Sequence, residues 1–177
     1  LTLEHARLLM DEEPAQAHKS IHQAIDDLNH TIRDIRAYIL DLRPRQLHDE
    51  SLMEGLKRLV NEFRANTLVE VSLQGPADGL TRLPDAPAIA LFHICQEALA
   101  NVAKHARARR VEVSGWTTPD RALVEVSDDG RGFNMEKVRL SIGHGLLNMQ
   151  TRVRNVSGDV EITSEEGAGT SVLVWVP

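Results

Sequence analysis

The sequence predicts an α+β protein in which an α-helical hairpin precedes a two-layer α/β sandwich. Three observations support this prediction. Apolar residues follow a strict heptad spacing near the start of the chain, short segments later in the chain alternate apolar and polar residues, and longer segments between them repeat apolar residues with helical spacing. The alternating segments predict strands and the longer segments predict helices, and together they fit one sheet covered on one face by helices. We therefore expect two parts, residues 1–43 and residues 44–177.

The composition excludes several classes of protein. A chain of 177 residues with 42% hydrophobic residues can bury a core and fits one ordinary domain with a small appendage. The formal net charge of −6 argues against direct nucleic-acid binding, which needs a basic surface. Cys95 is the single cysteine, so the chain has no internal disulfide. Its place on the apolar side of a predicted helix indicates a buried small side chain rather than a reactive thiol.

The location of the protein is suggested by what the chain lacks. No run of apolar residues approaches the roughly 18 that a membrane-spanning helix needs, and no signal peptide opens the chain. Because the chain begins at Leu1 without Met, we expect a piece of a longer protein. We expect this piece to be cytoplasmic, with room for a membrane anchor or sensor upstream.

The clearest periodicity in the chain is a heptad seam that follows an interruption at Pro14. The seam consists of Ile21, Ile25, Leu28, Ile32, Ile35, Ile39 and Leu42. A helix on the surface of a globular domain usually shows a wider apolar stripe, so the narrow seam favours a coiled coil or bundle. With residues 1–12 as the tail of a preceding helix, residues 1–43 are expected to form a hairpin that dimerises into a four-helix bundle. The alternative is one helix lying on its own domain.

The segments after Pro44 predict the elements of the sandwich. Ser51 and Glu54 have the spacing of a capping box at the start of the next helix. The predicted helices cover residues 51–65, 87–106 and 145–156, and the predicted strands cover residues 69–73, 110–116, 121–127, 159–164 and 170–176. A loop over 128–143 separates the middle strands from the last helix.

The segment Ser127–Phe133 carries an Asp-x-Gly-x-Gly pattern at the end of a predicted strand. Gly130 and Gly132 permit a sharp bend or a close approach of the backbone to a ligand. Asp128 is then held at the strand end, with its carboxylate facing whatever the turn admits. Asp129 is expected to face solvent or to cap the turn. Alone, the pattern is equally typical of an ordinary hairpin.

The predicted helix over 87–106 places three polar residues on one face. Glu97, Asn101 and His105 are spaced at i, i+4 and i+8, and the alternative is an ordinary solvated face. An amide oxygen such as that of Asn101 suits Mg²⁺, which prefers oxygen ligands and keeps several waters while bridging phosphates. Glu97 could hold a metal-bound water or accept a proton. Lys104 and His105 are candidates to face phosphates, although His105 could equally be a satisfied histidine near the helix end.

A second candidate site lies at the start of the last predicted helix. Gly143, His144 and Gly145 precede Leu146, and backbone N–H groups at such a helix start bind anions such as phosphate. The preceding segment, residues 134–142, carries Lys137 and Arg139. It could close over a bound ligand or be a plain surface loop.

Four segments in this order resemble the N, G1 and G2 boxes and the following Gly-x-Gly-Thr of the ATP-binding domain of bacterial sensor histidine kinases. They are Phe92–Ala106, Ser127–Phe133, Gly143–Met149 and Gly167–Thr170. That domain has the Bergerat-type fold, which gyrase, heat-shock chaperones and MutL repair proteins share. The pattern Gln-Glu-Ala-Leu-x-Asn-x-x-Lys-His-Ala is most similar to the class of nitrate sensors and the membrane-fluidity sensor DesK.

The resemblance implies ATP and Mg²⁺ as ligands and assigns roles to residues. Asn101 is the implied metal ligand, and Glu97 and Asn101 are the implied catalytic residues. Asp128 is expected to accept a hydrogen bond from the exocyclic amine of adenine, with support from the Thr170 hydroxyl. The full set of expected nucleotide-binding residues is Asn101, Lys104, His105, Asp128, Gly130, Gly132, Phe133, Gly143, His144, Gly145, Leu146 and Thr170.

The implied function is a protein-histidine kinase in two-component signal transduction. It would pass the γ-phosphoryl of ATP to a histidine and then to an aspartate of a response regulator, by resemblance one of the helix-turn-helix DNA-binding type. None of the eight histidines lies in the expected phosphoacceptor context, and we interpret His48-Asp49-Glu50 as unrelated to it. We therefore expect this chain to bind ATP but not to phosphorylate itself. The alternatives are a serine kinase of the anti-sigma-factor type and a non-catalytic nucleotide-binding dimerisation module.

Overall fold

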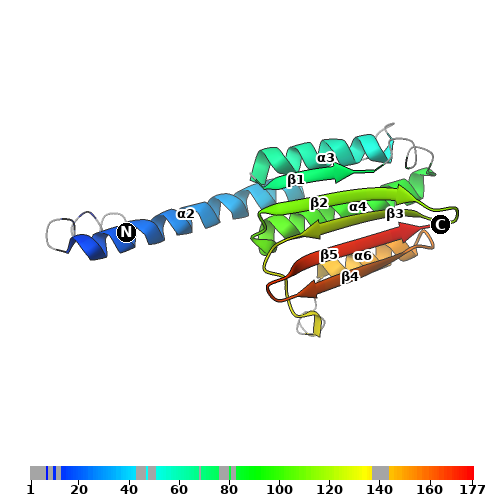
Figure 1. The fold of residues 1–177 in the computed structure, drawn as a ribbon. Helices are drawn as coiled ribbons and strands as arrows, with labels where there is room; N and C mark the ends of the chain where they lie inside the picture. Colours follow the sequence, from blue (N-terminus) through cyan, green and yellow to red (C-terminus); the bar gives the residue numbers. More distant parts are fainter. Residues whose placement is uncertain are drawn as a thin grey trace.

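In a computed structural model, the chain forms a five-stranded sheet with helices on one face, and a long helix extends away from this body (Figure 1). The structure describes residues 7, 10, 13–42, 47, 51–67, 69–75, 80, 83–136 and 144–177. The helices are α2 (Pro14–Leu42), α3 (Leu52–Thr67), α4 (Asp85–Asn101) with a π-helical turn η1 (Val102–Ala106), and α6 (His144–Arg154). The strands are β1 (Glu70–Gln74), β2 (Arg110–Thr117), β3 (Ala122–Asp128), β4 (Asp159–Glu165) and β5 (Gly169–Val176).

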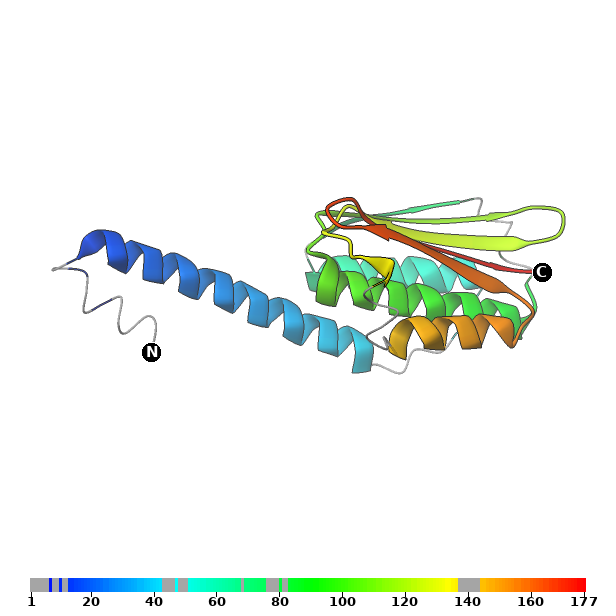
Figure 2. The ribbon, with the colours of Figure 1, turned by 90° about the horizontal axis from the view of Figure 1, so that it is seen from below.

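The helix α2 carries the heptad seam and begins at Pro14, as the interruption in the sequence pattern predicted. Proline is well tolerated in the first turn of a helix because its missing N–H would have no partner there. The seam residues Ile25, Leu28 and Ile35 are 48%, 60% and 53% exposed. Figure 2 shows that only the C-terminal end of α2 approaches the body, where it meets α3 and η1. The expected first helix of the hairpin, over residues 1–12, lies outside the described residues apart from Arg7 and Met10.

The sheet has the strand order β1-β2-β3-β5-β4. The strands β1 and β2 are parallel, with α3 before them and α4 in the crossover between them, whereas all other neighbours are antiparallel. The hairpins β2–β3 and β4–β5 meet where β3 pairs with β5. In that register Asp128 lies opposite Thr170, and Thr170 lies opposite Ser164 on β4.

The core lies between the inner face of the sheet and the layer made by α3, α4 and α6 (Figure 2). Alternate residues of the strands point into it, and the largest fully buried side chains include Phe63, Phe92, Leu56, Leu91 and Val124. At the start of α3, the backbone N–H of Ser51 donates to Glu54 Oε2 at 2.9 Å, and the Glu54 N–H donates to Ser51 Oγ at 3.3 Å. The predicted capping box is therefore confirmed, as is the two-layer α+β class.

The helix predicted over residues 87–106 differs from the observed one in two respects. It begins at Asp85, and its last five residues form the wider π-helical turn η1. Arg107 then adopts a left-handed conformation, with φ 54°, that ends the helix. A π-helical turn admits an extra residue, which periodicity in the sequence does not reveal.

The helical stretch Asp85–Ala106 is long and apolar enough to span a membrane by length and composition. The stretch is apolar on average, but polar residues such as His93, Gln96 and Glu97 interrupt its apolar run. More than half of its most apolar part, 56%, is buried inside the protein. The stretch is therefore the central core helix of the body.

Candidate functional site

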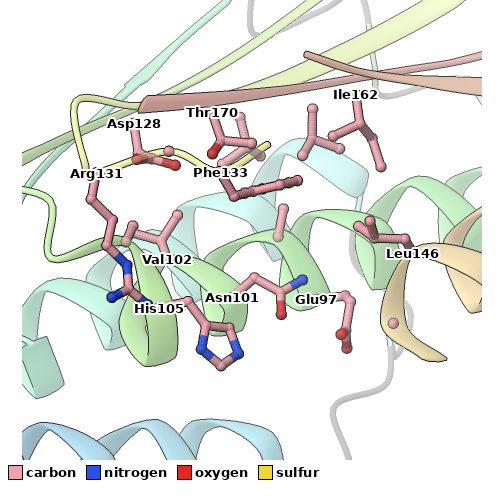
Figure 3. A pocket seen from close by; sticks show the side chains of 16 residues that line it. Glu97, Asn101, Val102, His105, Asp128, Arg131, Phe133, Leu146, Ile162 and Thr170 are labelled. Atoms are coloured by element: carbon pink, nitrogen blue, oxygen red, sulfur yellow. The ribbon is translucent and has the colours of Figure 1, made fainter. Parts of the chain in front are cut away.

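A cavity of about 460 Å³ lies between the inner face of strands β3, β5 and β4 and the helical wall made by α4, η1 and the start of α6 (Figure 3). Many of the residues singled out in the sequence line it: Glu97, Asn101, His105, Asp128, Gly132, Phe133, Gly145, Leu146 and Thr170. They come from segments that are far apart in the chain. The fold thus brings the Asp-x-Gly-x-Gly turn, the polar helix face and the α6 start to one cavity.

Asp128 is the last residue of β3 and is only 9% exposed. Its Oδ1 accepts a hydrogen bond from the N–H of Gly130 at 2.8 Å. Burial raises the pKa of this carboxyl, while hydrogen bonds from the backbone of Gly130 and of Thr170 partly oppose that rise. The result is a buried acceptor on the cavity wall, suited to a ligand that offers a hydrogen-bond donor.

The glycines of the turn are required by close backbone contacts. Gly132 has φ +55°, and a Cβ on it would collide with the carbonyl oxygen of Glu165. A Cβ on Gly130 would collide with the carbonyl oxygen of Ala106. We expected these glycines to permit either a sharp bend or a close approach of the backbone to a ligand. In the structure, the tight contacts are with the protein's own backbone, and Gly130 is not among the cavity-lining residues.

Asp129 is exposed, one of the two roles expected from its position, and its carboxylate binds the backbone at the start of β2. Its Oδ1 accepts hydrogen bonds from the N–H groups of Arg109 and Arg110, both at 2.8 Å. The bond from Arg110 is the main reason why the pKa of Asp129 is lowered. Asp129 thus ties the start of β2 to the end of β3 while Asp128 faces the cavity.

The helical wall presents Glu97, Asn101 and His105 to the cavity in the predicted order along the helix (Figure 3). Glu97 lies against the start of α6, because a Cβ on Gly145 would be 2.6 Å from Glu97 Oε1. Glu97 and Asn101 both offer oxygen atoms, the donor type that Mg²⁺ prefers. Within the described part of the chain, no group of three His, Cys, Asp or Glu residues could hold a metal ion. Lys104 lies in η1 and is not among the lining residues.

The start of α6 forms the far end of the cavity. The helix begins at His144, and Gly145 and Leu146 line the cavity whereas His144 does not. Gly143 lies outside the described residues, as do Lys137 and Arg139 of the segment predicted to close over a nucleotide. The same holds for His48-Asp49-Glu50.

Ser164 on β4 is a residue that the sequence patterns did not reveal. Its Oγ accepts a hydrogen bond from the N–H of Phe133 at 2.9 Å and donates to the carbonyl oxygen of Gly169 at 2.9 Å. The same oxygen is 3.0 Å from Oγ1 of Thr170. The sequence could have indicated this residue, because a short hairpin between the last two predicted strands places Ser164 opposite Thr170.

Arg131 is a second residue that was missed. Its N–H donates to the carbonyl oxygen of Ala106 at 2.7 Å, and its carbonyl oxygen accepts from the N–H of Gly167 at 2.7 Å. These two hydrogen bonds fix the backbone of Arg131. Its side chain lines the cavity and reaches from the glycine turn toward the helical wall (Figure 3). The apolar lining residues that were also missed are Ala98, Val102, Ala106, Val126, Ile162 and Val172.

Cys95 takes no part in the site. It is fully buried in the core, and burial raises the pKa of its thiol to about 12. The expectation of a buried small side chain rather than a reactive thiol is therefore confirmed.

Comparison with known proteins places these features in a family. Residues 86–177 match the model of the family described as histidine kinase-, DNA gyrase B-, and HSP90-like ATPase. Among curated proteins, the chain is 33% identical to the sensor histidine kinase LiaS of Bacillus subtilis over 175 residues, which are 99% of this chain and 46% of that protein. It is 38% identical to the sensor histidine kinase MctS of Rhizobium johnstonii over 161 residues, 89% of this chain and 34% of that protein. The chain thus spans less than half the length of these relatives.

Solved structures agree at the level of the fold. The histidine kinase domain of the blue-light activated histidine kinase of Erythrobacter litoralis EL346 aligns with a TM-score of 0.61 and 18% identity, over 99% of this chain and 93% of that domain. The mycobacterial sensor histidine kinase MprB aligns with a TM-score of 0.56 and 18% identity, over 72% of this chain and 94% of that one.

Proposed function

The chain belongs to the family of histidine kinase-, DNA gyrase B- and HSP90-like ATPases, and from this premise we propose that it is the ATP-binding catalytic part of a sensor histidine kinase. The observation that carries the proposal is that a buried carboxylate, the oxygen-bearing helix face and the start of α6 line the same cavity. A nucleotide needs these three features in one place, for its base, its metal-bridged phosphates and its anionic charge.

The base is proposed to lie against Asp128 and Thr170, the polar residues of the sheet wall. Ionised Asp128 accepts a hydrogen bond from the exocyclic amine of adenine. The apolar side chains of Val126, Ile162 and Val172 around it would contact the faces of the ring. Phe133 lines the same cavity and would add contact area.

The phosphates are proposed to lie along the helical wall. Asn101 would hold Mg²⁺ through its amide oxygen, and Glu97 would hold a metal-bound water or accept a proton from the attacking group. The N–H groups of His144 and Gly145 at the start of α6, together with Lys104 and His105, would face the phosphate oxygens. When bound, Mg²⁺ supplies positive charge to the phosphate oxygens, and the chain's own contribution is to position the reacting groups.

The reaction proposed for the parent protein transfers the γ-phosphoryl of ATP to a histidine nitrogen, with ADP as the leaving group. An aspartate of a response regulator, by resemblance one of the helix-turn-helix DNA-binding type, then takes the phosphoryl from that histidine. The phosphoacceptor histidine is proposed to lie outside this chain, and the location of the chain is proposed to be cytoplasmic.

A homodimer is proposed to form through residues 1–43. The exposure of Ile25, Leu28 and Ile35 supports this proposal, because large apolar side chains repeated along one helix seam leave water when a partner covers them.

The proposed function is tested by calorimetric titration of the chain with ATP and ADP, with and without Mg²⁺. We expect binding that is lost in Asp128→Ala and retained in Asp129→Asn, a matched control because Asp129 binds the backbone at the start of β2 without lining the cavity. Absence of binding in the unmodified chain would favour a non-catalytic dimerisation module. Incubation with labelled ATP and Mg²⁺ is expected to leave the chain unlabelled. An acid-stable phosphoprotein formed with added protein substrate would favour a serine kinase.

A further inference from the structure

The hydroxyl of Ser164 has three hydrogen-bonding partners but only one proton to donate. Its Oγ lies 2.9 Å from the nitrogen of Phe133, 2.9 Å from the carbonyl oxygen of Gly169 and 3.0 Å from Oγ1 of Thr170. A hydroxyl group has one proton to donate and two lone pairs to accept with. The three contacts therefore fill its capacity.

The chemistry of two of these partners determines the direction of the third hydrogen bond. The N–H of Phe133 can only donate, so Ser164 accepts from it. The carbonyl oxygen of Gly169 can only accept, so the Ser164 proton goes there. Toward Thr170, Ser164 has only a lone pair left, and the Thr170 hydroxyl must donate its proton to Ser164. Thr170 Oγ1 then has only lone pairs to offer any other group.

The register of the sheet puts this oxygen beside a second acceptor. Ser164, Thr170 and Asp128 are paired across strands β4, β5 and β3, and Thr170 and Asp128 both line the cavity (Figure 3). The ionised carboxylate of Asp128 is also an acceptor. This part of the wall therefore presents two acceptors and no hydroxyl donor, which complements an exocyclic amine with its two N–H groups. A carbonyl oxygen at the same position of a base would find no hydroxyl donor there.

We propose that Ser164 is a positioning residue that determines base selectivity, because it occupies the Thr170 proton and keeps the wall beside Asp128 an acceptor surface. This proposal rests on the proposed nucleotide binding. Ser164 acts through Thr170 and, by its bond to the Phe133 N–H, also joins the glycine turn to the β4–β5 hairpin.

The test compares ADP with IDP, in which a carbonyl replaces the exocyclic amine, by calorimetric titration of several variants. The unmodified chain is expected to prefer ADP. Ser164→Ala frees the Thr170 hydroxyl to donate, so the ratio of ADP to IDP affinity is expected to fall by roughly tenfold, the value of about one hydrogen bond. Ser164→Cys, whose thiol is a weak acceptor, tests the same point with smaller disturbance of the packing. Ser164→Thr keeps the hydroxyl and should restore the ratio, and Thr163→Ala, on the neighbouring exposed position of β4, should leave it unchanged.

A structural role alone predicts a different outcome. If Ser164→Ala and Ser164→Cys weaken ADP and IDP by the same factor, or weaken neither, the selectivity proposal is wrong. In the background of Thr170→Val, which lacks the hydroxyl, Ser164→Ala should no longer change the ratio, and a change there would also overturn the proposal. If the unmodified chain binds neither nucleotide, the proposed function itself fails, a result that differs from equal weakening.

Discussion

The helix α2 and the α/β body differ in the exposure of their apolar side chains. In the body, Leu56, Leu91 and Phe92 are fully buried by contacts within one chain. Along α2, Leu28 is 60% exposed and Ile35 is 53% exposed, although the helix repeats its apolar residues more regularly than any segment of the body. Regular spacing therefore describes which face of an element is apolar, and only the tertiary structure decides whether the same chain covers it. The body is expected to be stable by itself, whereas α2 depends on a partner.

The largest expected effect is on stability, and it compares two glycines of the body that share a positive φ but differ in how closely other backbone atoms approach them. Gly132 and Gly167 both have positive φ, 55° and 88°, but a Cβ on Gly132 collides with backbone whereas Gly167 has nothing within 4 Å. Gly132→Ala should lower the free energy of unfolding by more than about 3 kcal/mol and abolish nucleotide binding. Gly167→Ala should cost about 1–2 kcal/mol, from conformational strain alone. Urea unfolding of both variants measures the difference, and equal losses would contradict the role of the contact with Glu165.

The second prediction tests the partner dependence of α2. Replacing Leu28 and Ile35 with serine removes two apolar side chains, each worth about 2 kcal/mol when buried. The dimer dissociation constant should rise by at least about 100-fold in analytical ultracentrifugation, while nucleotide binding by the body stays unchanged. Asp26→Ser, on an exposed position off the seam, is the matched control. A monomeric unmodified chain, or a dimer that survives the double substitution, would show that α2 is not the dimerisation surface.

The third prediction concerns the cost of the buried carboxylate in the body. Burial raises the pKa of Asp128 above its ordinary value, so the folded state binds a proton more readily than the unfolded state. The cost of burying the ionised carboxylate therefore destabilises the fold in full at pH values above the raised pKa. This cost decreases as the pH falls through the raised pKa and disappears below the ordinary pKa of an aspartate. Asp128→Asn should therefore be at least as stable as the unmodified chain at pH 7, with an advantage that shrinks in acid. Its affinity for ADP should nevertheless be at least about tenfold weaker.

Thermal unfolding between pH 4 and 8 measures the stability of Asp128→Asn, and ADP titration over the same range measures its affinity. In the unmodified chain, ADP affinity should fall as the pH drops through the raised pKa, because a protonated carboxyl is a poorer acceptor. A less stable Asp128→Asn at neutral pH would mean that the hydrogen bonds from Gly130 and Thr170 outweigh the cost of burial.

The smallest expected effect concerns Asp129, the exposed neighbour of Asp128. Asp129→Ala loses two hydrogen bonds from backbone N–H groups and should lower the free energy of unfolding by about 1 kcal/mol at pH 7. Because the fold lowers the pKa of Asp129, its contribution is present above the ordinary pKa and is lost as the pH falls through the lowered value. The difference between the two proteins should therefore vanish in strong acid. A difference that persists there, in urea unfolding, would argue against an ionic origin.

Much of the fold and part of the site could be predicted because their signals are local. The capping box of Ser51 and Glu54, the alternating strands and the Asp-x-Gly-x-Gly turn are each specified within a few residues. The π-helical turn η1 was not predictable, because it depends on how the helix end meets Arg107 and the turn at Gly130. Ser164 and Arg131 were missed for a related reason. Their contacts join β4 to Phe133 and the glycine turn to Ala106 and Gly167, and such pairings exist only once strands far apart in sequence are in register.

The place where β3 meets β5 has a consequence for the order of folding. The hairpins β2–β3 and β4–β5 are local and can form early, whereas their pairing joins residues 42 to 54 positions apart and is entropically slower to reach. Asp128 belongs to one hairpin, and Thr170 and Ser164 belong to the other, so the base-binding wall does not exist until the two hairpins have joined. A ligand for this wall would bind only the fully assembled sheet and would slow its opening along this line. Hydrogen exchange should therefore reveal ligand protection first at the amides between β3 and β5, rather than within either hairpin.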